Sequence, residues 1–369
     1  MSKLPGSFGR RPFTWKLWAG LAGLLFLLAI PLLRLAGGYL QTLGFLTFLY
    51  VTMSTAWNIL GGYTGQTSFG HATFYGLGAY TTMILALRGV PPLLTLPLAG
   101  IVAAVYGLLW GYPCLRLRGQ YFAIATIGVG EATRLLMLNL DDLLKNSALF
   151  AGLLRKGVLT GGATGLMLPT PPDIRAYATA FYYGGLALMF LALAISWWVR
   201  KSKFGLGLFA INMDIDAAET VGVPTTRYKI LALLLSAFMV GMAGSIYAQY
   251  VFYIDPQTVF GFPVSIAMVL MPTIGGIGTL VGPILGAVVY VVVQDRILTA
   301  NLTLGALKLS LSTMHLLVYG GLLVLIVLFE PKGLIGLFRR FARWWERRRP
   351  RLAALRDRNQ SEVGHGRTP

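Results

Sequence analysis

The stretch at residues 61–68, GGYTGQTS, contains the residue types from which proteins build phosphate-binding loops. Such a loop has the pattern G-x-x-x-x-G-K-[ST], follows a strand, and uses its Lys to bind the phosphates. Here Gln66 stands in the place of the Lys, the glycine spacing is one residue short, and the apolar residues WNIL precede the loop. We therefore expect that the chain does not bind ATP itself, and we assign it no catalytic residue, metal site or cofactor.

The same stretch has a second interpretation, because its glycines weaken a helix and its polar residues lie between long apolar segments. Non-helical backbone inside a membrane survives only where it is buried in protein or lines a water-filled cavity, and broken helices often form substrate sites. The candidate residues for lining a substrate route are Thr64, Gly65, Gln66, Ser68 and His71. The alternative is a polar turn before a tightly packed helix, with Gly76, Gly78 and Ala79 at the close contacts.

A later apolar segment, YFAIATIGVGEATRLLML (121–138), carries two opposite charges, Glu131 and Arg134. Their spacing of three residues places both on one face of a helix. Charges inside membrane spans are rare and usually face the bundle interior or a cavity, so this pair is a further candidate to line or gate a route. The alternative is an ion pair that locks two helices together or lies near the outer interface.

Long apolar segments must position these residues. The chain of 369 residues is 56% hydrophobic and 12% charged, whereas about a quarter of the residues of a soluble domain are charged. Several nearly uncharged segments approach the roughly 20 residues that are needed to cross a bilayer core of ~30 Å. The sequence therefore predicts an all-α polytopic membrane protein, in which 45 glycines and 18 prolines suit closely packed or broken helices.

We predict about ten transmembrane helices (8–10), some of them broken or re-entrant. The predicted spans are 15–33, 38–59, 71–87, 93–112, 120–139, 176–199, 229–250, 262–275, 280–297 and 312–329. The region 262–297 is divided at GGIGTLVGP (275–283), because one undivided span would place the basic C-terminal tail outside. A helix pair and a re-entrant segment would both satisfy this division.

The net charge of +18 could suggest a nucleic-acid partner. When both termini are placed in the cytoplasm, however, most of the basic residues lie in the predicted inside segments, as the positive-inside rule requires, so we expect no nucleic-acid partner. The predicted organisation is a basic N-terminus (1–14), a transmembrane domain (15–337) and a basic, partly disordered tail (338–369). We expect the tail to bind anionic membrane lipid, with contact to a partner subunit as the alternative. An outer loop (140–175), rich in Gly and Pro turns, suits a surface that meets an external partner.

The inner loop (200–228) contains FGLGLFAINMDIDAAETVGVPTTRYK (204–229), which continues into the next predicted span. This stretch is too polar to span a membrane and too patterned to be a linker. We predict that Asn212 caps a short helix with Asp214 in its first turn, and that Gly222 ends this helix. Thr225 or Thr226 would then cap the following span.

A short helix displayed between two spans suits a knob that docks into a groove of a cytoplasmic partner. The alternative is an amphipathic helix that lies on the membrane surface. The acidic residues Asp214, Asp216 and Glu219 are disfavoured beside anionic lipid, so we favour docking.

One short loop and five further stretches, which occur in order along the chain, carry a resemblance to a transporter family. DAAETVG (216–222) resembles the EAA-x3-G loop of ABC importer permeases, with Asp216 in place of the usual Glu. Other stretches look like the branched-chain amino acid permeases of LivM type, and the resemblance runs from about residue 40 to 336. These stretches are GGYTGQTSFGHATFYGLGAY (61–80), LRLRGQYFAIATIGVGEATR (115–134), LTGGATGL (159–166), GVPTTRYKILALLLSAFMVGMAGSIYA (222–248) and LLVLIVLFEPKGLIG (322–336).

The resemblance implies a permease subunit of an ATP-driven importer in a bacterial or archaeal plasma (inner) membrane. It implies four kinds of partner: a second homologous permease of LivH type, two cytoplasmic ABC ATPase subunits that use the ATP, an external substrate-binding protein, and membrane lipid. The residues that it assigns to ATPase coupling are Asn212, Asp214, Asp216, Ala217, Ala218, Glu219 and Gly222.

Two alternatives remain open. Permeases for urea and short-chain amides resemble the same family closely, so the cargo is not settled by these motifs. A secondary carrier or channel without ATPases is a different class of protein. The docking loop and the lack of a ladder of intramembrane carboxylates argue against that class.

Overall fold

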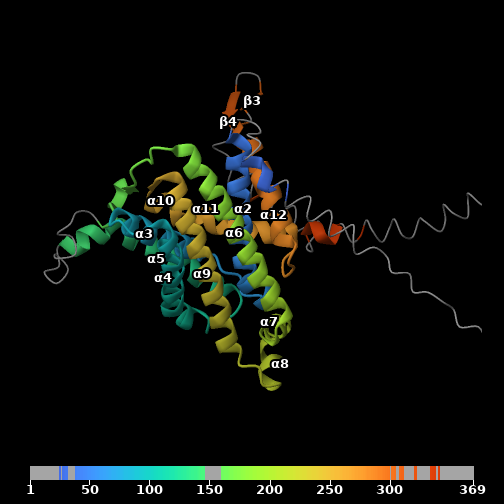
Figure 1. Cartoon of the computed structure of the whole chain (residues 1–369). Helices are drawn as coiled ribbons and strands as arrows, with labels where there is room; N and C mark the ends of the chain where they lie inside the picture. The colour runs from blue at the N-terminus through green and yellow to red at the C-terminus, as the bar shows by residue number, and fades with distance from the viewer. Residues whose placement is uncertain are drawn as a thin grey trace, which may run out of the picture.

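The computed structural model shows a mostly helical molecule (Figure 1). It describes residues 25, 27–31, 38–145, 159–299, 301–304, 307–310, 320–321, 333–337 and 340. Most of the predicted spans 15–33 and 312–329 lies outside these described residues. The basic N-terminus (1–14) and, apart from Arg340, the tail (338–369) also lie outside them.

Eleven labelled helices make up most of the described part of the chain. They are α2 (Tyr39–Thr64), α3 (His71–Leu87), α4 (Pro92–Cys114), α5 (Gln120–Lys145), α6 (Ile174–Lys201), α7 (Lys203–Met213), α8 (Ile215–Thr220), α9 (Thr225–Val251), α10 (Pro256–Val259), α11 (Phe262–Gly275) and α12 (Gly282–Thr299). Because α5 continues to Lys145, the first residues of the predicted outer loop 140–175 are helical instead.

Two small antiparallel sheets, which the sequence did not predict, join this helical frame. Strand β1 (Leu166–Met167) pairs with β2 (Tyr253–Ile254), and Leu166 lies opposite Ile254. Strand β3 (Asn301–Leu304) pairs with β4 (Leu307–Ser310) in a hairpin. Figure 1 shows this hairpin at one end of the molecule, and α7 and α8 at the opposite end.

Among the described residues, six helices are long and apolar enough to cross a membrane. They are α2, α4, α5, α6, α9 and the combined segment Pro256–Gly275. The chain is therefore a multi-pass, α-helical membrane protein, while the predicted count of about ten spans is not confirmed. The predicted spans 71–87 and 262–275 coincide with α3 and α11, and the other predicted spans between 38 and 297 each overlap one helix.

Helices α2 and α9 form the centre of the bundle, since 72% and 67% of their apolar windows are buried, against 22% for α5. Helices α3 and α9 meet at glycines, because a Cβ on Gly78 would lie 2.0 Å from the carbonyl oxygen of Gly241. A Cβ on Gly76 would lie 2.5 Å from the ring of Phe260. Gly76 and Gly78 are thus closely packed, as the alternative interpretation of this stretch expects and as is usual where small residues bring membrane helices together.

The division of 262–297 is also confirmed, since α11 ends at Gly275 and α12 begins at Gly282. The two helices form a tightly packed pair, joined by a turn that the fully buried Asn58 of α2 holds. The Nδ2 of Asn58 donates to the carbonyl oxygen of Thr279 at 2.9 Å, and the backbone N–H of Gly278 donates to Oδ1 of Asn58 at 2.9 Å. A buried side-chain amide thus satisfies the backbone of this turn.

Candidate functional site

The chain leaves its helical path between α2 and α3. Helix α2 ends in Gly65, which has a left-handed φ of 73°, and residues 65–70 are not helical. The hydroxyl of Ser236 on α9 donates to the carbonyl oxygen of Ala56 at 2.7 Å and also contacts the ring of His71 at 2.9 Å. The start of α3 therefore lies beside Ala56, about two helical turns before the end of α2, and the break at 65–70 folds back inside the bundle.

Side chains from three helices satisfy the backbone of this break. The indole N–H of Trp57 on α2 donates to the carbonyl oxygen of Ser68 at 2.7 Å. The backbone N–H of Phe69 donates to Oγ1 of Thr126 on α5 at 3.0 Å, and Ser265 Oγ on α11 accepts from the first turn of α3 at 2.9 Å. These bonds meet the requirement that non-helical backbone at membrane depth be satisfied within the protein.

His71 locks the break against its neighbours. The side chain is fully buried, with Nδ1 2.9 Å from Ser68 Oγ and Nε2 2.9 Å from Ser236 Oγ. Because the Ser236 hydroxyl donates to the carbonyl oxygen of Ala56, the proton between His71 and Ser236 belongs to Nε2. Both ring nitrogens are thus engaged in hydrogen bonds that position α3.

Of the candidate residues in the break, Ser68 lines a small cavity of about 30 Å³. The cavity lies between α3, α4, α5 and α9, and its polar wall includes Thr73 and Thr126. Thr64, Gln66 and His71 are buried but do not line it. The volume corresponds to about one water molecule, so this cavity is not a cargo site in the conformation described.

Glu131 and Arg134 form a close ion pair on α5, with Arg134 Nε 3.0 Å from Glu131 Oε2. Their side chains are 52% and 16% exposed, respectively. Neither lines the small cavity, so the structure links the break to α5 through Thr126 but does not join the ion pair to it. Glu131 thus lies on the exposed surface of α5, and Leu135, one helical turn further along, is also exposed.

The predicted short helix exists as α8, but its cap differs from the prediction. Asp214 is the N-cap, since its Oδ1 accepts from the backbone N–H of Ala217 at 2.9 Å. Asn212 is not the cap, because α7 continues through it to Met213 and its backbone is helical. Its Nδ2 instead donates to the carbonyl oxygen of Gly62 at 3.1 Å, which joins α7 to the end of α2.

The end of α8 follows the prediction at one glycine and departs from it at the next helix. Gly222 has a left-handed φ of 86° directly after α8, as expected for a residue that ends a helix. The predicted cap of α9 by Thr225 or Thr226 is wrong, because Pro224 is the N-cap and no side chain caps the helix. Thr225 is the first residue of α9, and its hydroxyl donates to the Glu219 carboxylate instead.

The residues in and next to α8 differ in how far they are buried. Ala218 is buried, at 3% exposure, and Asp216 forms an ion pair with Arg118 at 2.9 Å. Met213, the last residue of α7, and Val221, directly after α8, are 91% and 77% exposed. Figure 1 shows α8 beyond the ends of the long helices, so both apolar side chains project from the bundle.

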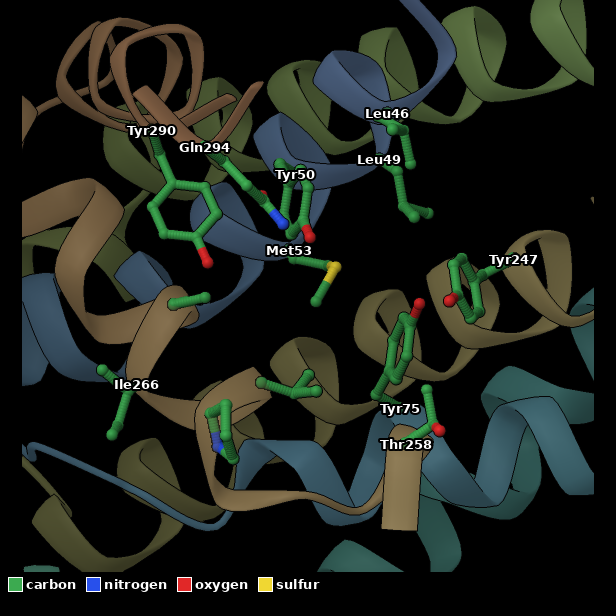
Figure 2. Close-up of a pocket in the computed structure, with 13 residues that line it drawn as sticks. Leu46, Leu49, Tyr50, Met53, Tyr75, Tyr247, Thr258, Ile266, Tyr290 and Gln294 are labelled. Carbon is green, nitrogen blue, oxygen red and sulfur yellow. The ribbon is translucent and has the colours of Figure 1, made fainter. Parts of the chain in front are cut away.

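A larger cavity of about 200 Å³ lies among the central helices. Tyr50 of α2, Tyr75 of α3, Tyr247 of α9 and Tyr290 of α12 surround it (Figure 2). The rings lie in two pairs, with centroids 5.3 Å apart for Tyr50 and Tyr290 and 5.5 Å apart for Tyr75 and Tyr247.

Sequence reasoning missed this cavity, although the sequence contains a signal for it. Two of the four tyrosines, Tyr50 and Tyr290, lie near the middle of predicted spans, whereas membrane tyrosines are usually enriched at the two interfaces with water.

Comparison with known proteins places this architecture among transporters. A family model described as the permease component of branched-chain amino acid transport systems matches residues 38–327. High-affinity branched-chain amino acid transport system permease protein LivM of Salmonella typhimurium is 29% identical over 332 residues, which cover 85% of this chain and 75% of the relative. LivM of Escherichia coli (strain K12) is 29% identical over 334 residues, with the same shares.

A more distant relative matches a shorter part of the chain. The autoinducer 2 import system permease protein LsrC of Yersinia pestis (strain Pestoides F) is 32% identical over 140 residues, which cover 35% of this chain and 39% of the relative. No solved structure matches the chain.

Proposed function

The chain belongs to the family of permease components of branched-chain amino acid transport systems, and from this premise we propose that it is the membrane-spanning subunit of an ATP-driven importer of branched-chain amino acids. The observation that carries the proposal is the similarity to two LivM proteins over 85% of the chain. The subunit provides half of the translocation path and has no ATPase site of its own, since ATP is used by partner subunits.

We assign α8 to contact with a cytoplasmic ABC ATPase subunit. The exposed side chains of Met213 and Val221 supply apolar area on a small projecting helix, which suits a knob in a groove. Buried Ala218 and the pair of Asp216 with Arg118 hold α8 in place. Of the residues that the resemblance assigned to coupling, Ala217, Asp214 and Gly222 shape this helix through its cap and its end.

Helix α7 provides a physical connection from α8 to the substrate route. Asn212 holds the end of α2 through the carbonyl oxygen of Gly62, and the ring of Phe209 packs on that of Tyr63 with centroids 5.0 Å apart. The break begins at Gly65, directly after this contact. A shift of α8 on the ATPase would therefore move the end of α2 and the break together.

We assign the exposed face of α5 to the second permease and to the route between the two subunits. Lipid is a poor neighbour for the half-exposed Glu131 of the ion pair, and a protein partner or water removes this conflict. An external binding protein delivers the amino acid, and both termini are cytoplasmic, as the distribution of basic residues predicts.

The proposal is tested with the full chain co-expressed with its partner subunits and reconstituted in proteoliposomes. Val221→Glu on α8 is expected to lower ATP-dependent leucine uptake by about tenfold or more, because a buried, unpaired charge is strongly unfavourable at an interface. Leu93→Glu is the matched control and is expected to retain uptake. Leu93 is also exposed, at 81%, but lies at the start of α4, beside the carboxyl end of α9 and away from α8.

Three results would contradict the proposal. Equal uptake by the two variants would exclude α8 as the docking element. Uptake driven by an ion gradient without an ATPase subunit would favour a secondary carrier. A paired binding protein that binds urea and no branched-chain amino acid would overturn the assigned cargo.

A further inference from the structure

The cavity of about 200 Å³ among α2, α3, α9, α11 and α12 lies apart from the surfaces assigned above. It shares no lining residue with the small cavity beside the break, and neither Glu131 nor Arg134 reaches it. This volume is many times the roughly 10–15 Å³ that a single water molecule requires. That is room for a small organic molecule of the size of an amino acid.

The walls of the cavity combine two kinds of chemistry. Leu46, Leu49, Met53 and Ala267 give it an aliphatic side, as is typical of small-molecule sites between helices. Figure 2 shows the four tyrosines around the space with their hydroxyl oxygens turned inward, and the amide of Gln294 beside Tyr50. Phenol hydroxyls and an amide N–H group can donate hydrogen bonds to a carboxylate. The aromatic faces of tyrosine rings attract an ammonium group.

The start of helix α11 favours the binding of an anionic group in the cavity. The helix begins at Phe262, and Pro263 and Val264 of its first turn line the cavity. The amino-terminal end of a helix carries a partial positive charge, which stabilises an anionic group nearby. Because no charged side chain lines the cavity, a ligand with an additional charge in its side chain would be buried without a partner, which is strongly unfavourable.

We propose that this tyrosine-lined cavity binds a zwitterionic amino acid with an aliphatic side chain. The aliphatic wall receives the side chain, while the hydroxyls, the amide and the start of α11 receive the carboxylate and the ammonium group. The inference rests on the proposed function for the identity of the cargo, and it adds a binding site inside this one subunit, separate from the surface shared with a second permease.

The binding test uses the full chain in lipid nanodiscs and L-leucine as the probe, observed by saturation-transfer difference NMR. We expect a leucine signal that isoleucine and valine displace and that lysine and urea do not. Ala267→Leu places a larger aliphatic side chain in the cavity and is expected to lower leucine affinity at least tenfold. Tyr75→Phe is expected to lower it about tenfold, as for the loss of one hydrogen bond to a charged group.

Tyr80→Phe is the matched control on the same helix. The hydroxyl of Tyr80 is buried and has no hydrogen-bond partner within the described part of the chain, and the residue does not line the cavity. Its substitution is expected to leave leucine affinity unchanged. If Ala267→Leu does not elute as a single folded species, Tyr75→Phe against Tyr80→Phe decides the question.

Uptake by the complete reconstituted transporter separates this inference from the proposed function. ATP-dependent leucine uptake together with a leucine signal that Ala267→Leu and Tyr75→Phe leave unchanged would overturn the cavity site and leave the proposed function intact. Absence of any leucine signal from the wild-type chain would have the same consequence. Failure of the transporter to take up any branched-chain amino acid would instead overturn the proposed cargo.

Discussion

Thr126→Val tests whether α5 holds the break at 65–70 in position. Thr126 Oγ1 accepts from the backbone N–H of Phe69 at 3.0 Å and donates to the carbonyl oxygen of Ala123 at 2.8 Å. Valine has nearly the same shape but offers no acceptor, so the N–H of Phe69 loses its partner. The perturbation therefore removes a polar contact between α5 and the break with little change in packing volume.

The expected loss in the free energy of unfolding depends on the N–H of Phe69, which the substitution leaves without a hydrogen-bond acceptor. A buried donor without a partner costs about 1–3 kcal/mol, and the bond to Phe69 is only partly buried. We therefore expect Thr126→Val to lower the free energy of unfolding by about 1–2 kcal/mol. Loss of the second bond adds little, because the carbonyl oxygen of Ala123 lies inside α5 and retains its helical donor.

Thr73→Val is the matched control, because Thr73 lines the same small cavity. Its Oγ1 is buried and has no hydrogen-bond partner among the residues that the structure describes. Removal of an unpaired buried hydroxyl is expected to be neutral or stabilising. Both variants are compared by equilibrium unfolding in mixed detergent micelles, followed by tryptophan fluorescence. Equal losses in the two variants, or a larger loss for Thr73→Val, would refute the role given to Thr126.

Two further substitutions test the helix packing and the turn at Thr160. Gly78→Leu is expected to abolish the monodisperse folded peak in size-exclusion chromatography, because even a Cβ at this position would lie 2.0 Å from the carbonyl oxygen of Gly241. Gly128→Leu is the control and is expected to retain the folded peak, because a Cβ at Gly128 would meet open space. Asp141→Asn is expected to lower the free energy of unfolding by about 1.5–3 kcal/mol and to speed proteolysis near residue 160. The Asp141 carboxylate accepts from the backbone N–H groups of Thr160 and Gly161, both at 2.9 Å, and an unchanged cleavage rate would contradict its role as an anchor.

The positions of the long helices were predictable because length and apolar composition alone decide which segments can cross a membrane. Helices α3 and α11 coincide with the predicted spans, and the division before α12 followed from the placement of basic residues. The existence of α8 and its end at Gly222 were also predictable, because a left-handed residue after a short helix is a local property of glycine.

Features that depend on neighbouring elements were not predictable in this way. Asn212 and Asp214 are both suitable caps by residue type, and only the continuation of α7 through Asn212 decides between them. The direction of the break depends on Ser236 and Ser265, which lie far from it in the sequence. The predicted lining role of His71 remains a prediction, since its ring bonds to two serines are equally consistent with a purely structural part.

The carboxyl end of α2 connects the parts of the molecule that are proposed to move. Asn58 holds the turn between α11 and α12 at Gly278 and Thr279, and one helical turn later the carbonyl oxygen of Gly62 accepts from Asn212 of α7. The break starts immediately beyond. A displacement of α7 that breaks the Asn212 contact, or of the α11–α12 pair that breaks the Asn58 contacts, would leave polar backbone without partners. We therefore expect α7, the end of α2 and the α11–α12 pair to shift as one unit. The amides of Asn58 and Asn212 thus give the proposed coupling a defined mechanical path, from the helix at the surface to the non-helical backbone inside the bundle.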